Sequence, residues 1–127
     1  MECRRSPDFR GITMTIKIRK PSDYMLDGIK VGIGATYHNG SNCYPYYVAS
    51  LYNGIVGIYR PGIVIVSRDK NIYDIDPFDP SISPTSYRKI YRNNWYDCDK
   101  DGNLIVPHRK SFPLVYGTAS YYLDPSI

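Results

Sequence analysis

Residues 28–69, GIKVGIGATYHNGSNCYPYYVASLYNGIVGIYRPGIVIVSRD, decide the fold of this chain. They contain three apolar runs rich in β-branched and aromatic residues, at Val31–Tyr37, Tyr46–Tyr52 and Ile63–Ser67. Such runs, bounded by Gly, Asn, Ser and Pro, are typical of β-strands, and none has the three-four spacing of an amphipathic helix. We therefore predict an antiparallel meander, the common beginning of a small barrel or sandwich.

The links between these runs predict particular turns. Asn53-Gly54 favours a two-residue hairpin between the second run and a further strand at Ile55–Tyr59, because both residues accept positive φ. Pro61-Gly62 favours a type II turn. The segment His38–Pro45 is long for a tight hairpin, so we expect a projecting loop there.

The second half of the chain continues the β pattern with one interruption. Tyr73–Thr85 contains three prolines, which remove ladder donors, so it is expected to be an ordered excursion or a flexible loop rather than a central strand. Tyr87–Tyr96 is expected to be one further strand. Shorter strands are predicted at Leu104–Val106, Ser111–Tyr116 and Ala119–Leu123. The predicted fold class is all-β, a small SH3-like barrel or sandwich of five to seven strands.

The two ends of the chain carry opposite signals. Residues 1–13 hold three arginines and no apolar period, so they predict a flexible N-terminal arm. Met14–Lys20 alternates like a strand and is expected to open a single domain over residues 14–127. Met14 is a candidate for an alternative translation start, with Met1 as the other. Tyr122–Ile127 is apolar enough that we expect it to be docked.

Composition bounds the function without naming it. The 127 residues include 14 tyrosines against three phenylalanines and one tryptophan, which suits either a thin core or a binding surface. A net charge of +4 permits an anionic partner without requiring one. No run approaches the roughly 20 apolar residues of a membrane span, so no membrane partner is expected, and no apolar segment predicts a secretory signal. Three cysteines without a C-x-x-C pair fit a reducing compartment.

Metal and catalytic motifs receive little support. Asp97–Leu104 (DCDKDGNL) matches the front half of a calcium loop, but His108 stands where the bidentate Glu belongs, so we interpret the stretch as a turn. The spacings of the other candidate ligands do not match zinc patterns; these are His38, Cys43, Cys98 and His108. No nucleophile elbow, zinc-protease motif or phosphate loop is present, so neither a metal nor another cofactor is expected, and a small enzyme remains only an alternative.

The strongest candidate site is the basic, aromatic stretch Tyr87–Tyr96. Arginine pairs phosphate oxygens in a bidentate manner, and Tyr or Trp offers a ring on which a base can stack. We therefore predict an anion-binding surface with stacking platforms, formed by Arg88, Arg92 and Trp95, with Tyr91 or Tyr44 as the platform. The alternative is an edge strand whose cations block aggregation and whose aromatic rings fill the core.

Several motifs, in this order, resemble short phage and prophage accessory proteins. They are V-G-x-G-A-T at residues 31–36, G-S-[DN]-x-Y-P-Y at residues 40–46, a basic tryptophan-bearing strand at Arg92–Trp95, and Y-x-D-P-S-[FI] at Tyr122–Ile127. The chain departs from the pattern at Asn42, where such proteins have Asp, and at Ile127, where they have an aromatic residue.

The resemblance implies an accessory protein that acts in the host bacterial cytoplasm. Some small phage proteins of this kind counter host defence by sequestering nucleotide signalling molecules. On that basis the expected partner is an anionic small molecule such as a cyclic nucleotide or an ADP-ribose derivative, bound by a monomer or a homo-oligomer. The alternative is a structural or nucleic-acid-associated phage protein.

Overall fold

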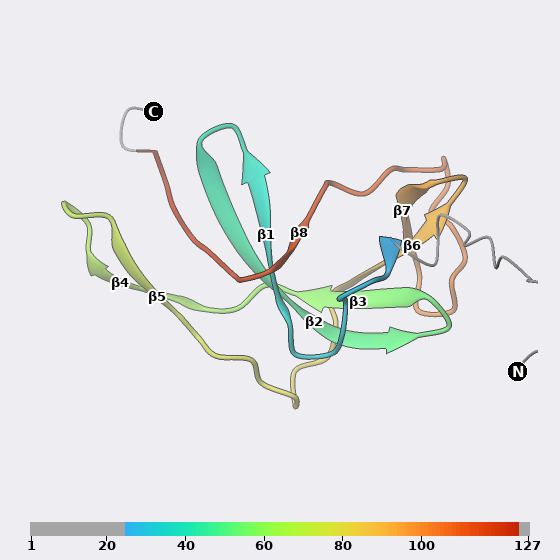
Figure 1. Ribbon diagram of the computed structural model, residues 1–127, viewed down its shortest axis with the longest axis horizontal. Coiled ribbons are helices and arrows are strands. Elements are labelled where there is room, and N and C mark those ends of the chain that lie inside the picture. Colours follow the sequence, from blue (N-terminus) through green and yellow to red (C-terminus); the bar gives the residue numbers. More distant parts are fainter. Residues whose placement is uncertain (1–24, 125–127) are drawn as a thin grey trace, which may run out of the picture.

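The computed structural model describes residues 25–124 (Figure 1). All its named elements are β-strands, which confirms the predicted all-β class. Residues 1–24 and 125–127 lie outside the described part, so the predicted arm at 1–13 and the strand at Met14–Lys20 stay predictions. No helix in residues 25–124 has the length and apolar character needed to cross a membrane.

Six of the eight strands form one antiparallel sheet in the order β7-β6-β3-β2-β1-β8. These strands are β1 (Gly34–Asn39), β2 (Asn42–Tyr52), β3 (Ile55–Tyr59), β6 (Ser86–Tyr91), β7 (Asn94–Cys98) and β8 (Val115–Gly117). The other two, β4 (Ile63–Ser67) and β5 (Ile72–Ile75), form a separate antiparallel ribbon. The eight strands are one more than the largest number predicted, which was seven.

The long strand β2 gives the sheet its curl. Its first half pairs with β1 and its second half with β3, and the register shifts between Val48 and Ser50. Figure 1 shows β2 changing direction between these two partners, while the β4–β5 ribbon projects from the opposite end from β6 and β7. A bulge increases local twist and bends the strand that carries it. The curled sheet is consistent with the small barrel or sandwich predicted from the sequence.

One face of the sheet holds the hydrophobic core, and we call it the core face. Val48 lies opposite Ile58, and Leu51 lies opposite Val56, so these side chains project from the same face. Packed on them are Ile29 and partly buried residues from both ends of the described chain, namely Leu26, Ile33, Phe112, Leu114 and Tyr116. The other surface, here the outer face, carries the alternate residues of each strand.

The predicted connections have different outcomes. The type II turn predicted at Pro61-Gly62 is wrong, because Gly62 does not have the positive φ that such a turn requires. Asn53 and Gly54 adopt φ values of 53° and 76°, which confirms the hairpin between β2 and β3. The projecting loop predicted at His38–Pro45 is wrong, because β1 and β2 remain paired up to Asn39 and Asn42. Gly40, with φ of 62°, makes the tight two-residue connection possible.

The single strand predicted at Tyr87–Tyr96 is also wrong. The chain reverses at Arg92 and Asn93, with φ values of 50° and 65°, and the two halves pair as β6 and β7. Asn is one of the few residues other than Gly that tolerates this left-handed conformation. This reversal accounts for the additional strand and changes which side chains share a face.

The remaining predicted strands are shorter than expected or displaced. Leu104–Val106 contributes only a bridge from Leu104 to Cys98, and Ser111–Tyr116 contributes β8 at its end. Tyr73–Thr85 is not wholly an excursion, because its first three residues belong to β5, which pairs with β4 at a distance from the main sheet. Its later part is an ordered excursion, held where the Asp79 backbone N–H donates to the Tyr59 hydroxyl at 2.9 Å.

The C-terminal segment is docked as far as the structure describes it. Cys43 and Tyr122 exchange two backbone hydrogen bonds of 2.8 and 3.0 Å. The Asp124 N–H donates to the Asn42 side-chain oxygen at 2.7 Å. The docking predicted for Tyr122–Ile127 is therefore confirmed for residues 122–124. The Asn42 side chain thus anchors this segment.

Candidate ligand-binding face

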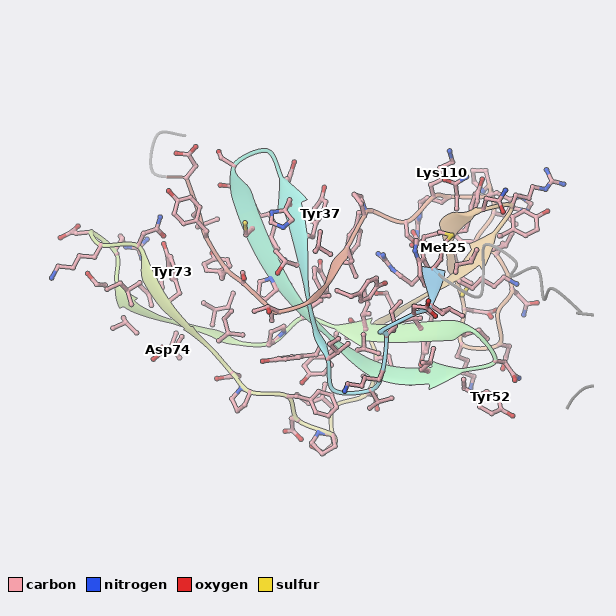
Figure 2. The ribbon with its side chains drawn as sticks, in the orientation of Figure 1. Met25, Tyr37, Tyr52, Tyr73, Asp74 and Lys110 are labelled. Carbon is pink, nitrogen blue, oxygen red and sulfur yellow. The ribbon has the colours of Figure 1, made fainter. Side chains whose placement is uncertain are left out.

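On the outer face of the β6–β7 hairpin, a tyrosine lies between two lysines. Tyr96 on β7 lies directly opposite Lys89 on β6 and forms a bridge with Lys110 on its other side. Residues opposite each other in antiparallel strands project from the same face. Two ammonium-bearing side chains therefore flank the Tyr96 ring, and Figure 2 shows Lys110 at this end of the molecule.

Three rings meet beside these lysines. The Tyr91 and Tyr96 centroids are 5.6 Å apart, and His108 lies 5.7 Å from Tyr91 and 6.5 Å from Tyr96. All three contacts are edge-on, a favoured arrangement for aromatic pairs. The rings and their flanking cations form what we call the outer cluster, comprising Lys89, Tyr91, Arg92, Tyr96, His108 and Lys110.

Arg92 occupies the turn of the hairpin and remains exposed. Its guanidinium carbon lies 5.1 Å from the Tyr91 ring centroid, within cation–π range. Its φ of 50° is uncommon for Arg, and Asn or Gly would adopt that conformation more readily. Residues held in such conformations concentrate at functional sites, so the backbone of Arg92 is a second reason to consider it a candidate binding residue.

Two of the nearby carboxylates are occupied by neighbouring donors. Asp97 projects from the core face opposite Arg88 and accepts hydrogen bonds from Arg109 Nε at 2.7 Å and Ser111 Oγ at 2.5 Å. Asp99 accepts from the N–H groups of Asp101 and Asn103, both at 2.9 Å. The bonds from Asn103 are the main cause that lowers the pKa of Asp99, and they confirm the turn predicted here.

Basic residues outnumber acidic ones around the outer cluster. Within residues 86–111 the three aspartates are Asp97, Asp99 and Asp101, and the six basic residues are Arg88, Lys89, Arg92, Lys100, Arg109 and Lys110. Most of the net charge of +4 therefore falls in this stretch. The stretch is suited to attract an anionic partner.

The structure divides the predicted site residues between two faces. Tyr91 and Arg92 belong to the outer cluster, whereas Arg88 is only 2% exposed and lies on the core face opposite Val56. The Arg88 guanidinium carbon is 4.6 Å from the Phe112 ring centroid. Trp95, opposite Ile90, packs against the core with its ring 6.1 Å from that of Tyr116. The turn at Arg92–Asn93 causes this division.

Tyr44 belongs to a different group of rings. It lies on β2 opposite Tyr37, with ring centroids 6.1 Å apart, and 6.3 Å from Tyr121. The Arg60 guanidinium lies 4.9 Å from its ring centroid. Tyr44 is thus a platform for Arg60 rather than a member of the outer cluster.

Sequence reasoning missed four members of the outer cluster, which are Lys89, Tyr96, His108 and Lys110. The missing signal was the Asn93-Asn94 pair, a recognised turn composition that would have divided the stretch into a hairpin. With that division Tyr96 falls opposite Lys89. The bridge that adds Lys110 and the contact that adds His108 depend on tertiary packing and leave no local pattern.

The candidate metal ligands do not assemble. Cys43 Sγ lies 3.4 Å from His38 Nδ1 across the β1–β2 hairpin. Cys98 is buried on β7, and this burial raises the pKa of its thiol. Among residues 25–124 no group of three or more His, Cys, Asp or Glu side chains is placed to hold a metal ion.

Comparisons of the chain with protein-family models, curated proteins and solved structures found no match.

Proposed function

We propose that this protein binds a ligand that carries both a phosphate and a base, and that the outer cluster is its binding face. The observation that carries the proposal is the meeting of three aromatic rings with Lys89, Arg92 and Lys110 on one face of the β6–β7 hairpin. Rings supply stacking surfaces for bases, and the cations supply charge-assisted hydrogen bonds to phosphate.

Arg92 is assigned the phosphate contact. Its side chain is exposed at the tip of the hairpin and lies beside the Tyr91 ring, so one ligand can meet both. An arginine fork binds two phosphate oxygens at once, which a lysine cannot reproduce. An arginine in a conformation that Asn or Gly would adopt at lower cost supports a role for its guanidinium in binding.

The particular ligand we favour is a nucleotide second messenger, such as a cyclic nucleotide or an ADP-ribose derivative. The support comes from the resemblance of the motifs at 31–36, 40–46 and 122–127 to phage accessory proteins, some of which sequester such messengers. In this proposal the protein works without catalysis in the cytoplasm of an infected bacterium. It holds the messenger and so lowers the concentration available to the host.

A second candidate ligand is single-stranded nucleic acid. The supporting observation is that two cations of the outer cluster, Arg92 and Lys110, are exposed. Figure 2 shows Lys110 at the β6–β7 end of the molecule. Proteins that bind single strands commonly combine a basic track with stacked aromatic side chains.

The test is a titration of cyclic nucleotides, ADP-ribose and short oligonucleotides into the wild type, Arg92→Ala and Arg92→Lys. If Arg92 pairs a phosphate, Arg92→Ala weakens binding by about 1.5–3 kcal/mol, and Arg92→Lys recovers only part. Arg68→Ala is the matched control, because Arg68 is an exposed arginine near the β4–β5 turn. Binding also weakens as salt rises.

The outcomes separate the candidates. Tight binding of one mononucleotide, recovered unchanged after denaturation, supports sequestration. Preference for oligonucleotides with a steep salt dependence supports the nucleic-acid alternative. Equal affinities of the wild type and Arg92→Ala, or no binding to any member of the panel, would contradict the assignment of this face.

A further inference from the structure

A cavity of about 420 Å³ lies at the end of β3, beneath the proline-rich excursion. Its walls come from two segments, residues 59–62 at the end of β3 and just after it, and residues 76–85 after β5. A volume of this order is within the usual range for small-molecule sites. None of the residues of the outer cluster lines it.

The walls are aromatic and fixed in place. Tyr59 is only 2% exposed, and its hydroxyl accepts the Asp79 N–H, which ties the excursion to the sheet. The Phe78 ring lies 6.2 Å from that of Tyr59 and 5.8 Å from that of Tyr47. Three prolines complete the apolar lining, namely Pro61, Pro77 and Pro80. A flat or aliphatic body therefore finds apolar contact on several sides.

Two carboxylates stand at this cavity. Asp79 accepts hydrogen bonds from the Ser81 hydroxyl at 2.7 Å and the Ser81 N–H at 2.9 Å, and these bonds lower its pKa, so it stays ionised at neutral pH. Asp76 has no basic partner within ion-pair distance among residues 25–124, although its backbone N–H is held by the Gly62 carbonyl at 3.0 Å. The negative charge of Asp76 helps to raise the pKa of Tyr47, after the larger effect of burial.

The one basic residue of the lining is turned toward another partner. The Arg60 guanidinium packs on the Tyr44 ring at 4.9 Å, and no ion pair joins it to Asp76 or Asp79. The charge of the cavity is thus set by two carboxylates beside aromatic walls. Aromatic faces attract cations, and carboxylates accept hydrogen bonds from the N–H groups of ammonium ions, so both features favour the same ligand chemistry.

We propose that this cavity is a binding site for a small organic cation, a primary ammonium group on an aromatic or aliphatic body. The body packs against Tyr59 and Phe78, and the ammonium donates to the Asp76 carboxylate. This site is independent of the outer cluster, which is basic and is assigned to phosphate-bearing ligands. Failure of either assignment leaves the other standing.

The experiment uses 2-phenylethylamine as the probe and 3-phenylpropionate as its anionic counterpart of similar shape. Each is titrated into the full-length protein while the amide NMR signals are followed. We expect the amine to bind with a dissociation constant on the order of millimolar, as suits a small fragment, and to shift signals of Tyr59, Gly62 and Phe78. The acid is expected to leave these signals unchanged.

The variant Asp76→Asn tests the charged contact. It is expected to weaken binding of the amine about tenfold, the loss that follows when a charged hydrogen bond is removed. Asp69→Asn is the control, since Asp69 is also exposed but lies near the β4–β5 turn. Because Asp76 is exposed, the substitution is expected to preserve the fold, which the NMR spectrum of the variant checks directly.

Any of three results would overturn the proposal. The acid could bind as tightly as the amine, Asp76→Asn could bind the amine as well as the wild type does, or the amine could shift only signals remote from the cavity. Adenosine, a neutral ribonucleoside, is included as a further probe. Tighter binding of adenosine than of the amine at this cavity would replace the cation with a neutral ligand.

Discussion

Gly34 is a residue whose lack of a side chain allows two distant parts of the chain to meet. A Cβ atom built there would collide with the backbone nitrogen of Ala119 and lie 3.0 Å from the Thr118 carbonyl carbon. Two residues further along β1, the Thr36 hydroxyl donates a hydrogen bond to the Thr118 carbonyl oxygen at 2.6 Å. Gly34 and Thr36 thus form the part of β1 against which residues 118 and 119 pack.

We expect Gly34→Ala to lower the free energy of unfolding by about 1–3 kcal/mol, the usual cost of overpacking. The obstacle is backbone, which cannot rotate away. Gly62→Ala is the control, because there the new Cβ would meet the side chain of Asp76, which can move. Urea unfolding of both variants measures the difference. Equal stabilities would show that the C-terminal segment yields without cost.

Arg88 is a charged side chain that is buried without an ion pair in the described part of the chain, because the carboxylate opposite it, Asp97, is bonded to Arg109 and Ser111. Its Nη1 atom has no hydrogen-bond partner, and no ion pair among residues 25–124 includes it. Its guanidinium instead lies over the Phe112 ring. Burying a charge with so little compensation is costly, and apolar replacements of similar volume are commonly neutral or stabilising.

Arg88→Met is therefore expected to leave the free energy of unfolding unchanged or to raise it by up to about 4 kcal/mol. Arg88→Ala is expected to lower it, since the alkyl stem also packs in the core. Unfolding curves do not show whether ligand binding is preserved, so ligand titrations are also measured on both variants. A loss above about 2 kcal/mol in Arg88→Met would show that the guanidinium itself stabilises the core.

At the scale of elements, the β4–β5 ribbon is set apart because it is not paired with the six-stranded sheet and its apolar side chains are exposed. Val64, Ile65 and Val66 on β4 are 57%, 46% and 55% exposed. Within residues 25–124 the outer edge of β4 has no neighbouring strand. A two-stranded ribbon with apolar side chains on both faces is marginal in water, and exposed apolar edges tend to pair with other chains.

We expect Val64→Lys to reduce self-association while changing the free energy of unfolding by no more than about 0.5 kcal/mol, because the side chain is exposed. Sedimentation at increasing protein concentration measures the first effect, and urea unfolding of dilute protein the second. Val48→Ala, in the core, is the contrasting variant and should lose stability without altering association. A wild type that stays monomeric at every protein concentration would contradict the expectation that the exposed edge of β4 pairs with a second chain.

The elements also show what a single sequence can reveal. Alternation and turn composition were enough for the all-β class, for β3 and for the Asn53-Gly54 hairpin, because these depend on neighbouring residues. The Asn93-Asn94 pair favours a turn, but the turn was missed because it begins at Arg92, and Arg rarely adopts positive φ. Arg88 and Trp95, which lie on the core face, were therefore assigned to the same surface as Arg92. The cavity beneath the excursion joins segments at the end of β3 and after β5, so no local pattern could predict it.

At the scale of the whole molecule, two tyrosines and one cysteine are expected to make the stability of the fold fall in alkali. Burial raises the pKa of Tyr116, and the nearby Arg88 charge only partly opposes this. Burial also raises the pKa of Tyr47 and of the Cys98 thiol. Each group is therefore neutral in the folded protein at a pH where it would begin to ionise in the unfolded chain.

The sign of the pH dependence follows from these raised values. A group whose pKa is higher in the folded state contributes stability that is complete below its unfolded pKa and is lost as the pH rises through its folded pKa. The reference values are 9.0 for Cys and 10.0 for Tyr, so stability is expected to fall from about pH 9 and to continue falling above pH 10.

Tyr116→Phe should make this alkaline fall shallower, because the variant has no buried phenol to ionise. At neutral pH the variant should lose little, since the Tyr116 hydroxyl lies near the Arg88 guanidinium but makes no hydrogen bond of good geometry among the described residues. Tyr52→Phe is the matched control, because the Tyr52 side chain is 76% exposed. Urea midpoints at pH 7, 9 and 10.5 compare the three proteins; identical slopes would mean that ionisation of Tyr116 is not coupled to unfolding.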